Sequence, residues 1–297
     1  MSQYICVDIG GTSIKHGVLD ENAIIKECNQ TKTEAWLGGA AVLDKVKTIG
    51  KQYKEQYENI EGICISTAGM VDPEEGKIVF AGELMPGYTG TCIKKELEKA
   101  LEMPCEVEND VNCAGLAEYV SGSAKESHIM FCATVGTGIG GCAIVNGRVF
   151  HGASNSACEV GYIPMGDSDF QTLGASSILV RKVAEKKIEP LDMWDGKKIF
   201  ALAEKGDKVC ISAIKEMCDV LGKGLATICY VLNPDTIVLG GGIMAQKKIL
   251  ENEIRDSLNR YLRPILAEHL QVCFAEYGNE AGMVGALYNF QNKYGRK

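Results

Sequence analysis

DIGGTSIKHGVLDEN at residues 8–22 and TVGTGIGGCAIVNGR at residues 134–148 align with each other without a gap. Each stretch predicts a strand, a glycine-rich hairpin, a second strand and a polar turn. A pattern that recurs along a chain indicates an internal duplication. We therefore expect two similar α/β halves, each opening with an antiparallel meander.

The elements predicted around these stretches give the two halves a common outline. Apolar periodicity and turn residues predict them as follows. In the first half we expect strands over 4–9, 14–19, 23–28, 62–66 and 106–108, and helices over 36–58, 93–103 and 111–122. In the second half we expect strands over 129–135, 141–147, 148–152, 236–239 and 271–275, helices over 208–232, 246–262 and 280–293, and a loop at 165–170.

The composition is that of a globular protein and excludes several functional classes. The 297 residues include 31 Lys+Arg and 39 Asp+Glu, a net charge of −8, which argues against a nucleic-acid surface. No apolar run is long enough to span a membrane, and Asp8 interrupts the apolar N-terminal stretch, so we expect no signal peptide and a cytoplasmic protein. The 13 cysteines form no CxxC pair, so we expect reduced thiols that act as small hydrophobic residues.

Glycine is clustered at the ends of three predicted strands. The clusters are Gly10-Gly11, 136–141 and 240–242, and they follow YICVDI, IMFCATV and TIVLG. Glycine lets backbone N–H groups approach a phosphate closely, although tight turns alone also explain such clusters. The segment 136–141 fits GxGxxG, but a strand-like segment follows it instead of a helix, which argues against a dinucleotide fold. A P-loop motif is also absent from the sequence.

Six motifs together resemble the ROK family of bacterial sugar kinases. DIGGTSIK, ISTAG, VENDVN, TVGTGIGG, EVGY and IVLGGGI follow one another in the family's order over essentially the whole chain. The resemblance implies the duplicated actin/hexokinase-like (ribonuclease H-like) α/β fold, with a cleft between the halves. It implies a smaller domain of residues 1–118 plus 281–297 and a larger one of 119–280. It also implies ATP and Mg²⁺, a cytoplasmic homodimer, and transfer of the γ-phosphate to a hexose or N-acetylhexosamine, at the 6-hydroxyl.

The resemblance assigns sugar and catalytic roles to the first-half motifs and to EVGY. Asp110 corresponds to the catalytic base, although an Asp at a strand-to-helix junction is also typical of a helix N-cap. The resemblance makes Asn109 a sugar-hydroxyl ligand and Glu159 a second sugar-binding carboxylate. The residues that it places along the sugar site are Ser66, Thr67 and Gly69.

The glycine-rich motifs correspond to the nucleotide side of the site. Two hairpins offer backbone N–H groups, hydroxyls and a cation to the phosphates. Asp8 corresponds to the Mg²⁺ ligand, directly or through water, because hard cations prefer carboxylate and water oxygens. The other residues assigned to ATP are Gly10, Gly11, Thr12, Lys15, Thr137, Gly138, Gly240, Gly241 and Gly242.

Two departures from the family pattern concern zinc and substrate. Tyr162 stands where many members have a zinc-ligating His, and residues 163–180 contain no Cys, so we expect no zinc. We expect Tyr162 and the apolar residues of 163–173 to pack in its place. Leu84 replaces an Asn that often contacts sugar. N-acetylmannosamine kinases and β-glucoside kinases or glucokinases both remain open as the nearest match.

Two other functions share this pattern. ROK transcriptional repressors carry a helix-turn-helix before the DIGGT strand, but only seven residues precede Asp8 here, which disfavours a regulator. A non-catalytic sugar sensor is the other alternative, and the presence of Asp110 and of both hairpins argues against it.

Overall fold

The computed structural model describes residues 2–295, which fall into two compact units. Unit 1 comprises Met1–Gly122, Val149–Ala157 and Asn279–Lys297, and unit 2 comprises Ser123–Arg148 and Cys158–Gly278. The chain therefore returns to unit 1 for a short segment before Cys158. The domain boundaries at 118/119 and 280/281 stay a prediction.

Unit 1 is built on a five-stranded sheet in the order β3-β2-β1-β4-β7. The first three strands form the predicted antiparallel meander, β4 pairs in parallel with β1, and β7 pairs in parallel with β4. The sheet therefore collects the carboxyl ends of β1, β4 and β7 at one edge. The bounds are β1 Gln3–Ile9, β2 Ser13–Asp20, β3 Ile25–Lys32, β4 Ile60–Thr67 and β7 Cys105–Asn109.

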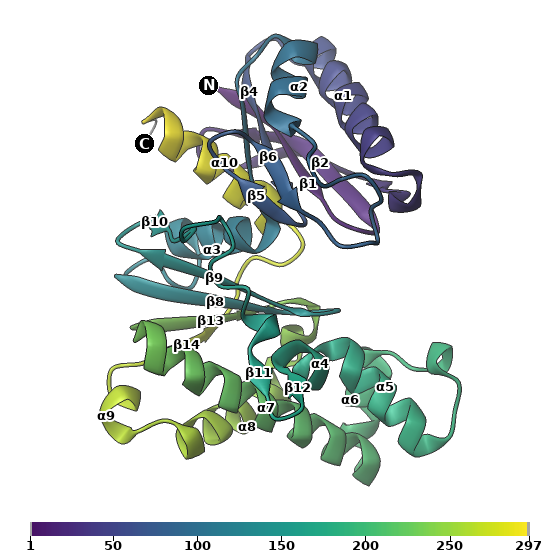
Figure 1. The fold of residues 1–297 in the computed structure, drawn as a ribbon, viewed down its shortest axis with the longest axis vertical. Helices are drawn as coiled ribbons and strands as arrows, with labels where there is room; N and C mark the ends of the chain where they lie inside the picture. Colours follow the sequence, from purple (N-terminus) through teal and green to yellow (C-terminus); the bar gives the residue numbers. More distant parts are fainter. Residues whose placement is uncertain (1, 296–297) are drawn as a thin grey trace. The chain divides into compact units, whose positions relative to one another are not determined.

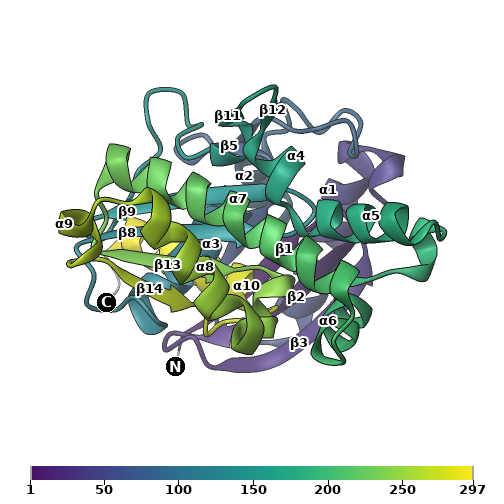
Figure 2. The same ribbon diagram turned by 90° about the horizontal axis from the view of Figure 1, so that it is seen from below.

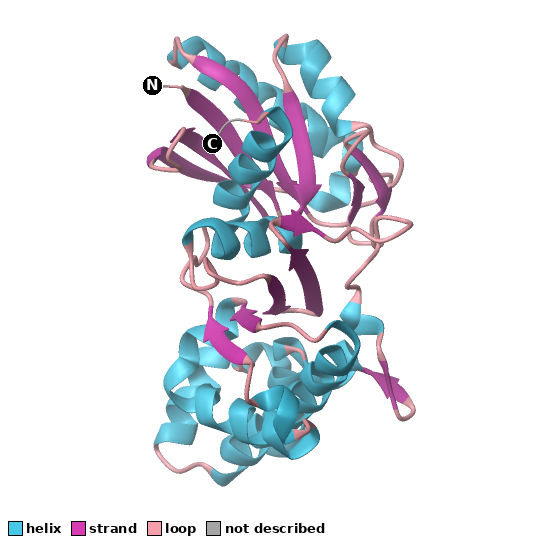
Figure 3. Ribbon diagram, turned by 90° about the vertical axis from the view of Figure 1, so that its left-hand side faces the viewer, coloured by secondary structure: helices cyan, strands magenta, loops and turns pink. Residues whose placement is uncertain are grey.

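Helices cover both faces of the unit 1 sheet (Figure 1). Tyr53 of α1 bonds to His16 on one face of the sheet, and α2 packs against α1. Helix α10, from the far end of the sequence, packs on β1 and β4 together with α3, and Figure 3 shows it crossing the strands. The bounds are α1 Gly39–Gln56, α2 Ile93–Leu101, α3 Asp110–Ser121 and α10 Ala281–Tyr294.

Unit 2 repeats this architecture with the strand order β10-β9-β8-β13-β14. Again the first strands are antiparallel and the two later ones are parallel to β8. Helices α7 and α8 lie side by side (Figure 2). The bounds are β8 Ile129–Val135, β9 Ile139–Val145, β10 Arg148–Val149, β13 Thr236–Gly240, β14 Gln271–Phe274, α4 Phe170–Gly174, α5 Ser176–Lys187, α6 Gly196–Glu204, α7 Lys208–Leu232, α8 Lys247–Tyr261 and α9 Pro264–Ala267.

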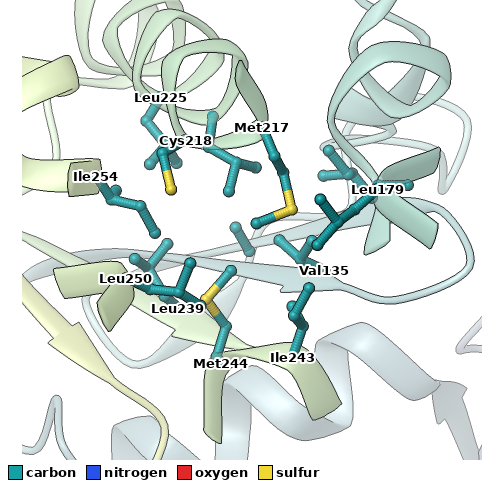
Figure 4. Packing of buried hydrophobic residues seen from close by; sticks show 14 of the residues in the cluster. Val135, Leu179, Met217, Cys218, Leu225, Leu239, Ile243, Met244, Leu250 and Ile254 are labelled. Atoms are coloured by element: carbon teal, nitrogen blue, oxygen red, sulfur yellow. The ribbon is translucent and has the colours of Figure 1, made fainter. Parts of the chain in front are cut away.

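The unit 2 core lies between the sheet and these helices (Figure 4). Val135 and Leu239 from the sheet meet Met217 and Leu225 of α7 and Leu250 of α8, and all five are buried. Burial of a leucine-sized side chain contributes about 1.5–3 kcal/mol, so the core fixes the strand ends that carry the glycine hairpins. Most of the thirteen cysteines are buried among apolar side chains, as their sequence neighbours indicate.

The identical strand order in both sheets confirms the predicted duplicated α/β fold. The gapless alignment of the two hairpins, however, is wrong by one residue beyond the turn. Ile9 pairs with Ile14 across β1 and β2, whereas Val135 pairs with Ile139 across β8 and β9, so the second hairpin is one residue shorter. A one-residue shift exchanges the two faces of a strand, so the pairing register, rather than the sequence, relates the halves.

Several elements differ from the predictions. The expected loop at 165–170 instead contains the β11–β12 hairpin (Pro164–Met165 and Ser168–Asp169) and the first residue of α4. A second small hairpin, β5 Met70–Asp72 and β6 Lys77–Phe80, and helices α4 to α6 were not predicted. The remaining short elements are the 3-10 helices η1 Ala35–Leu37, η2 Val160–Tyr162, η3 Leu191–Met193 and η4 Gly242–Gln246. None of the helices within residues 2–295 is long and apolar enough to cross a membrane.

Candidate active site

The candidate catalytic residues gather where β1, β4 and β7 of unit 1 end. Asp8 lies opposite Ser66 in the sheet, and Thr67 lies opposite Asn109. Asp110 follows as the first residue of α3. Parallel strands bring their carboxyl ends to one edge, so residues separated by about 100 positions become neighbours there.

Asp8 is held from three sides. The Ser66 hydroxyl donates to Asp8 Oδ1 at 2.7 Å, and Lys15 Nζ lies 3.7 Å from Oδ2. Gly282 of α10 lies so close that a Cβ on it would come within 2.5 Å of the Asp8 carboxyl group. The glycine therefore leaves room for the carboxylate at the start of α10.

The helix N-cap of α3 is Asn109, and Asp110 is not the cap that the alternative interpretation expected. Asn109 Oδ1 accepts hydrogen bonds from the N–H groups of Val111 and Asn112, at 2.9 and 3.1 Å. Its Nδ2 donates to Gly69 O and to Asp110 Oδ1, at 2.9 and 3.0 Å. These bonds use both hydrogens and both lone pairs of the amide, so Asn109 fixes the geometry of its neighbour.

Asp110 has an unusual protonation equilibrium for an aspartate. Desolvation of its carboxyl group and, secondarily, the negative charge of Asp8 raise its pKa to about 7. Hydrogen bonds from the backbone and from Asn109 oppose this rise only in part. A carboxylate with a pKa near neutrality is suited to accept a proton at physiological pH.

The hydroxyls of Ser66 and Thr67 are buried and have partners within the protein. Both residues are 0% exposed. Ser66 donates to Asp8, and Thr67 Oγ1 lies 2.7 Å from the hydroxyl of the buried Tyr88. Gly69 has a φ of +101°, which favours glycine, and a Cβ there would lie 2.8 Å from Phe80 O. Their part in sugar binding stays a prediction.

One residue at this edge was missed by the sequence analysis. His151 Nε2 lies 2.8 Å from Oε2 of Glu108, whose side chain is 0% exposed. The other oxygen of Glu108 accepts from the Asn109 N–H and from Asn112 Nδ2, at 2.8 and 2.9 Å. His151 lies in the segment that returns to unit 1, 43 positions from Glu108, and no sequence signal identified this pairing.

The first glycine hairpin is closed by hydrogen bonds that leave its tip exposed. Gly10 N donates to Ser13 O at 3.0 Å, and Thr33 Oγ1 donates to Gly10 O at 2.6 Å. Gly11 and Thr12 are exposed at the tip. Thr33, which the sequence analysis did not select, therefore anchors the hairpin from the end of the meander.

The second hairpin, in unit 2, is anchored by the start of α5. Ser176 donates to Gly136 O through both its N–H and its hydroxyl, at 3.0 and 2.6 Å. Ser177 Oγ donates to Thr137 O at 2.7 Å. A Cβ on Gly138 would lie 2.7 Å from the side chain of Gln171. The turn is thus fixed by residues some 40 positions away that carry no family signal in the sequence.

The third glycine cluster follows β13 of unit 2. Gly241 has a φ of +98°, and a Cβ on it would lie 2.3 Å from Val135 O at the end of β8. Gly240 pairs with Thr134 in the sheet, and a Cβ on Gly242 would meet no atom. Gly241 is therefore required because the backbone of Val135 passes too close for a side chain. Gly242, in contrast, borders open space.

Glu159 precedes the short helix η2 in unit 2, and Tyr162 is the last residue of that helix. Glu159 is exposed, and Cys158 before it has a φ of +67°. Tyr162 is 59% exposed, so the expectation that it packs in place of a ligating His is wrong. The expected apolar anchors are confirmed for Phe170, which lies fully buried in the core, and for Ile163 and Met165, which pack against that core. Within residues 2–295 no group of three His, Cys, Asp or Glu side chains is arranged to hold a metal ion.

One curated relative and two solved structures show what this chain is similar to. A beta-glucoside kinase of Klebsiella pneumoniae is 30% identical over 295 residues, covering 97% of this chain and 95% of that protein. The glucokinase structure from Streptomyces griseus in complex with glucose and AMPPNP has a TM-score of 0.83 and 28% identity, over 97% of this chain and 98% of that one. A protein provisionally named an N-acetylmannosamine kinase, from Listeria monocytogenes, has a TM-score of 0.87 and 28% identity, over 98% and 99% of the two chains.

These structures share the two-domain actin/hexokinase-like fold that the motifs implied. The family model described as the ROK family matches residues 4–293. That match covers the candidate catalytic residues of unit 1, both glycine hairpins and all but the last residue of α10. The chain therefore belongs to the ROK family of sugar kinases and related proteins.

Proposed function

We propose that this protein is an ATP-dependent kinase that transfers the γ-phosphate to the 6-hydroxyl of a hexose or N-acetylhexosamine. The observation that carries the proposal is the carboxyl group of Asp110, at the end of β7, with its pKa raised to about 7. A sugar hydroxyl is a weak nucleophile, so a base that accepts its proton speeds the attack by about 10²–10⁴-fold.

The proposed reaction is an in-line displacement at the γ-phosphorus. The sugar oxygen forms a bond to phosphorus while its proton passes to Asp110, and the bond to the β-phosphate oxygen breaks to release ADP. Most of the rate acceleration comes from positioning and from stabilisation of charge on the phosphoryl oxygens. The bonds from Asn109 and the helix N–H groups orient the base for this step.

The nucleotide is assigned to the glycine-rich turns. The exposed tip at Gly11 and Thr12 and the turn at Thr137 and Gly138 present backbone N–H groups of the kind that bind phosphate oxygens. Lys15 adds a cation beside Asp8. The AMPPNP bound to the Streptomyces griseus glucokinase supports ATP as the phosphoryl donor.

Asp8 fits a role with Mg²⁺. Its carboxylate is a hard oxygen donor held by Ser66, and ionised carboxylates are the usual protein ligands of this ion. Mg²⁺ bound there would neutralise charge on the phosphates. Zinc has no proposed part.

The sugar itself stays open between two classes. The beta-glucoside kinase of Klebsiella pneumoniae and the glucokinase of Streptomyces griseus favour glucose or a β-glucoside. The protein from Listeria monocytogenes favours N-acetylmannosamine. We assign Asp110, Gly69 and Glu159 to the sugar, with the buried Ser66 and Thr67 beside them in the sheet. Asn109 would bind a sugar hydroxyl by exchanging one of its bonds within the protein, such as the one to Gly69 O. The homodimer and the cytoplasmic location stay predictions.

Coupled ADP release over a panel of sugars tests the proposal. Glucose, cellobiose, an aryl β-glucoside, N-acetylmannosamine and N-acetylglucosamine are each supplied with MgATP, and ³¹P NMR locates the new phosphate ester. We expect turnover with one class, a 6-phosphate product, and loss of turnover in Asp110→Asn. Binding of a sugar without any ADP release would contradict the kinase and favour the sensor or regulator.

A further inference from the structure

His151 and Glu108 form a partly buried pair next to the residues that end β7 in unit 1. His151 Nε2 lies 2.8 Å from Glu108 Oε2, and the Glu108 side chain has no exposure to solvent. The imidazole itself is 25% exposed, so it covers the Glu108 carboxylate while part of its own ring contacts solvent. A carboxylate buried in this way needs a cationic or hydrogen-bonding partner, because an unpaired buried charge costs several kcal/mol.

Glu108 also forms hydrogen bonds with the residues next to Asp110, the proposed base. Its second oxygen accepts from the Asn109 N–H at 2.8 Å and from Asn112 Nδ2 at 2.9 Å. Asn109 in turn caps α3 and donates to Asp110 Oδ1. The imidazole is therefore three hydrogen bonds from Asp110, through Glu108 and Asn109, at the strand-to-helix junction that sets the position of the base.

Carboxylates surround His151 on the elements that pack against it. The Glu108 side chain on β7 raises the pKa of His151, and Glu74 and Asp72 of the β5–β6 hairpin add smaller effects of the same sign. Glu74 is itself paired with Lys293 of α10. Desolvation of the imidazole opposes these effects without cancelling them, so the pKa of His151 is raised and its imidazolium form is favoured more than in a free histidine.

His151 also anchors the segment in which it lies. Val149–Ala157 belongs to unit 1 although the residues on either side belong to unit 2. Its loop is closed by a hydrogen bond from Ala157 N to His151 O at 3.1 Å. Glu159, the carboxylate assigned to sugar above, follows two residues later in the chain. The pair with Glu108 thus ties this connection to strand β7.

We propose that His151 is a positioning residue for phosphoryl transfer, which acts by clamping Glu108 and so holding Asn109 and Asp110 in their catalytic arrangement. The inference rests on the proposed kinase function. Loss of the imidazole leaves Glu108 buried beside the junction without its partner. Misplacement of a catalytic group by about 1 Å costs on the order of 100-fold in rate, so the effect reaches the chemical step without contact with substrate.

The test uses two substitutions of His151 that differ in one property. His151→Ala removes the partner of Glu108, whereas His151→Gln keeps a hydrogen-bond donor that does not titrate. The matched control is His269→Gln, at an exposed histidine of unit 2. For each protein kcat and the KM for sugar are measured with its best sugar from pH 6 to 9.5, together with Tm.

We expect His151→Ala to lose about 10- to 100-fold in kcat. His151→Gln should recover most of that loss and the wild-type Tm. In the wild type, kcat should fall modestly at alkaline pH, because the charge-assisted bond from the imidazolium to Glu108 becomes the weaker bond from neutral imidazole. His151→Gln should lack this alkaline fall and should match the alkaline wild type at every pH, because its amide is a neutral donor throughout, and His269→Gln should retain the fall.

The results that would overturn the inference are distinct from failure of the kinase assignment. If wild-type enzyme turns over and folded His151→Ala or His151→Gln matches it in kcat and pH profile, His151 has no positioning role and the kinase stands. A Gln variant that keeps the alkaline fall would likewise reject the clamp. Absence of turnover by the wild type with every sugar would reject the kinase, and this inference with it.

Discussion

Replacing Asp110 by Asn should remove activity and at the same time stabilise the fold. The pKa of Asp110 is raised from 3.8 to about 7, a difference of about 3 units (7 − 3.8). At about 1.4 kcal/mol per unit, keeping this carboxyl ionised costs the folded state roughly 4 kcal/mol at pH 8. Asn carries no charge, so it avoids most of this cost while it keeps an acceptor for the Val111 N–H.

The sign of the pH dependence follows from the direction of the shift. The folded state holds the proton more tightly than the unfolded state, so the penalty is absent below about pH 4 and grows up to about pH 7. Above pH 7 it is fully present. Wild-type stability should therefore fall over this window relative to Asp110→Asn, and the two proteins should converge at low pH.

Thermal melts and kinetics of the same variant measure both effects. At pH 8 Asp110→Asn should melt at least about 5 °C above the wild type, and Asp192→Asn at an exposed site should not. Its kcat should fall about 10²–10⁴-fold, and wild-type kcat/KM should rise with pH through about 7. Near-normal turnover by Asp110→Asn would refute the assignment of Asp110 as the catalytic base. If Asp110→Asn is no more stable than the wild type at pH 8, ionised Asp110 does not destabilise the folded state as inferred.

Three further substitutions or treatments test the rest of the site. Gly282→Ala places a methyl group 2.5 Å from the Asp8 carboxyl group, so kcat should drop about 10-fold or more with little change in Tm. Unchanged kinetics in this variant would show that Asp8 can move without consequence for catalysis. Gly241→Ala at a φ of +98°, against Val135 O, should raise the KM for ATP more than the KM for sugar in an ADP-release titration; equal effects would argue against a nucleotide role. Because residues 2–295 hold no group of three metal-ligating side chains, a zinc-selective chelator should leave Tm and activity unchanged in excess Mg²⁺; tightly bound stoichiometric zinc by elemental analysis would contradict this.

Local patterns in the sequence were sufficient for most of the fold. The helix predicted over 208–232 is α7 Lys208–Leu232, and the strand predicted over 129–135 is β8 Ile129–Val135. Both follow from an apolar periodicity that each segment carries by itself. Such patterns did not predict the helices between residues 163 and 205, because these helices are short and mix polar with apolar positions. Their amphipathic faces become evident only against the unit 2 core.

The sequence by itself also determined the family and the motifs, because contiguous residues such as ENDVN and GTGIGG carry them. Only the tertiary structure shows which distant residues form hydrogen bonds with those motifs. His151 reaches Glu108 across 43 positions, and Ser176 reaches the turn at Gly136 across 40. The one-residue difference between the hairpins and the exposure of Tyr162 were likewise evident only from the tertiary structure. Sequence patterns report the periodicity of one segment, whereas a hydrogen bond between distant segments depends on strand register and helix packing, which the whole chain fixes together.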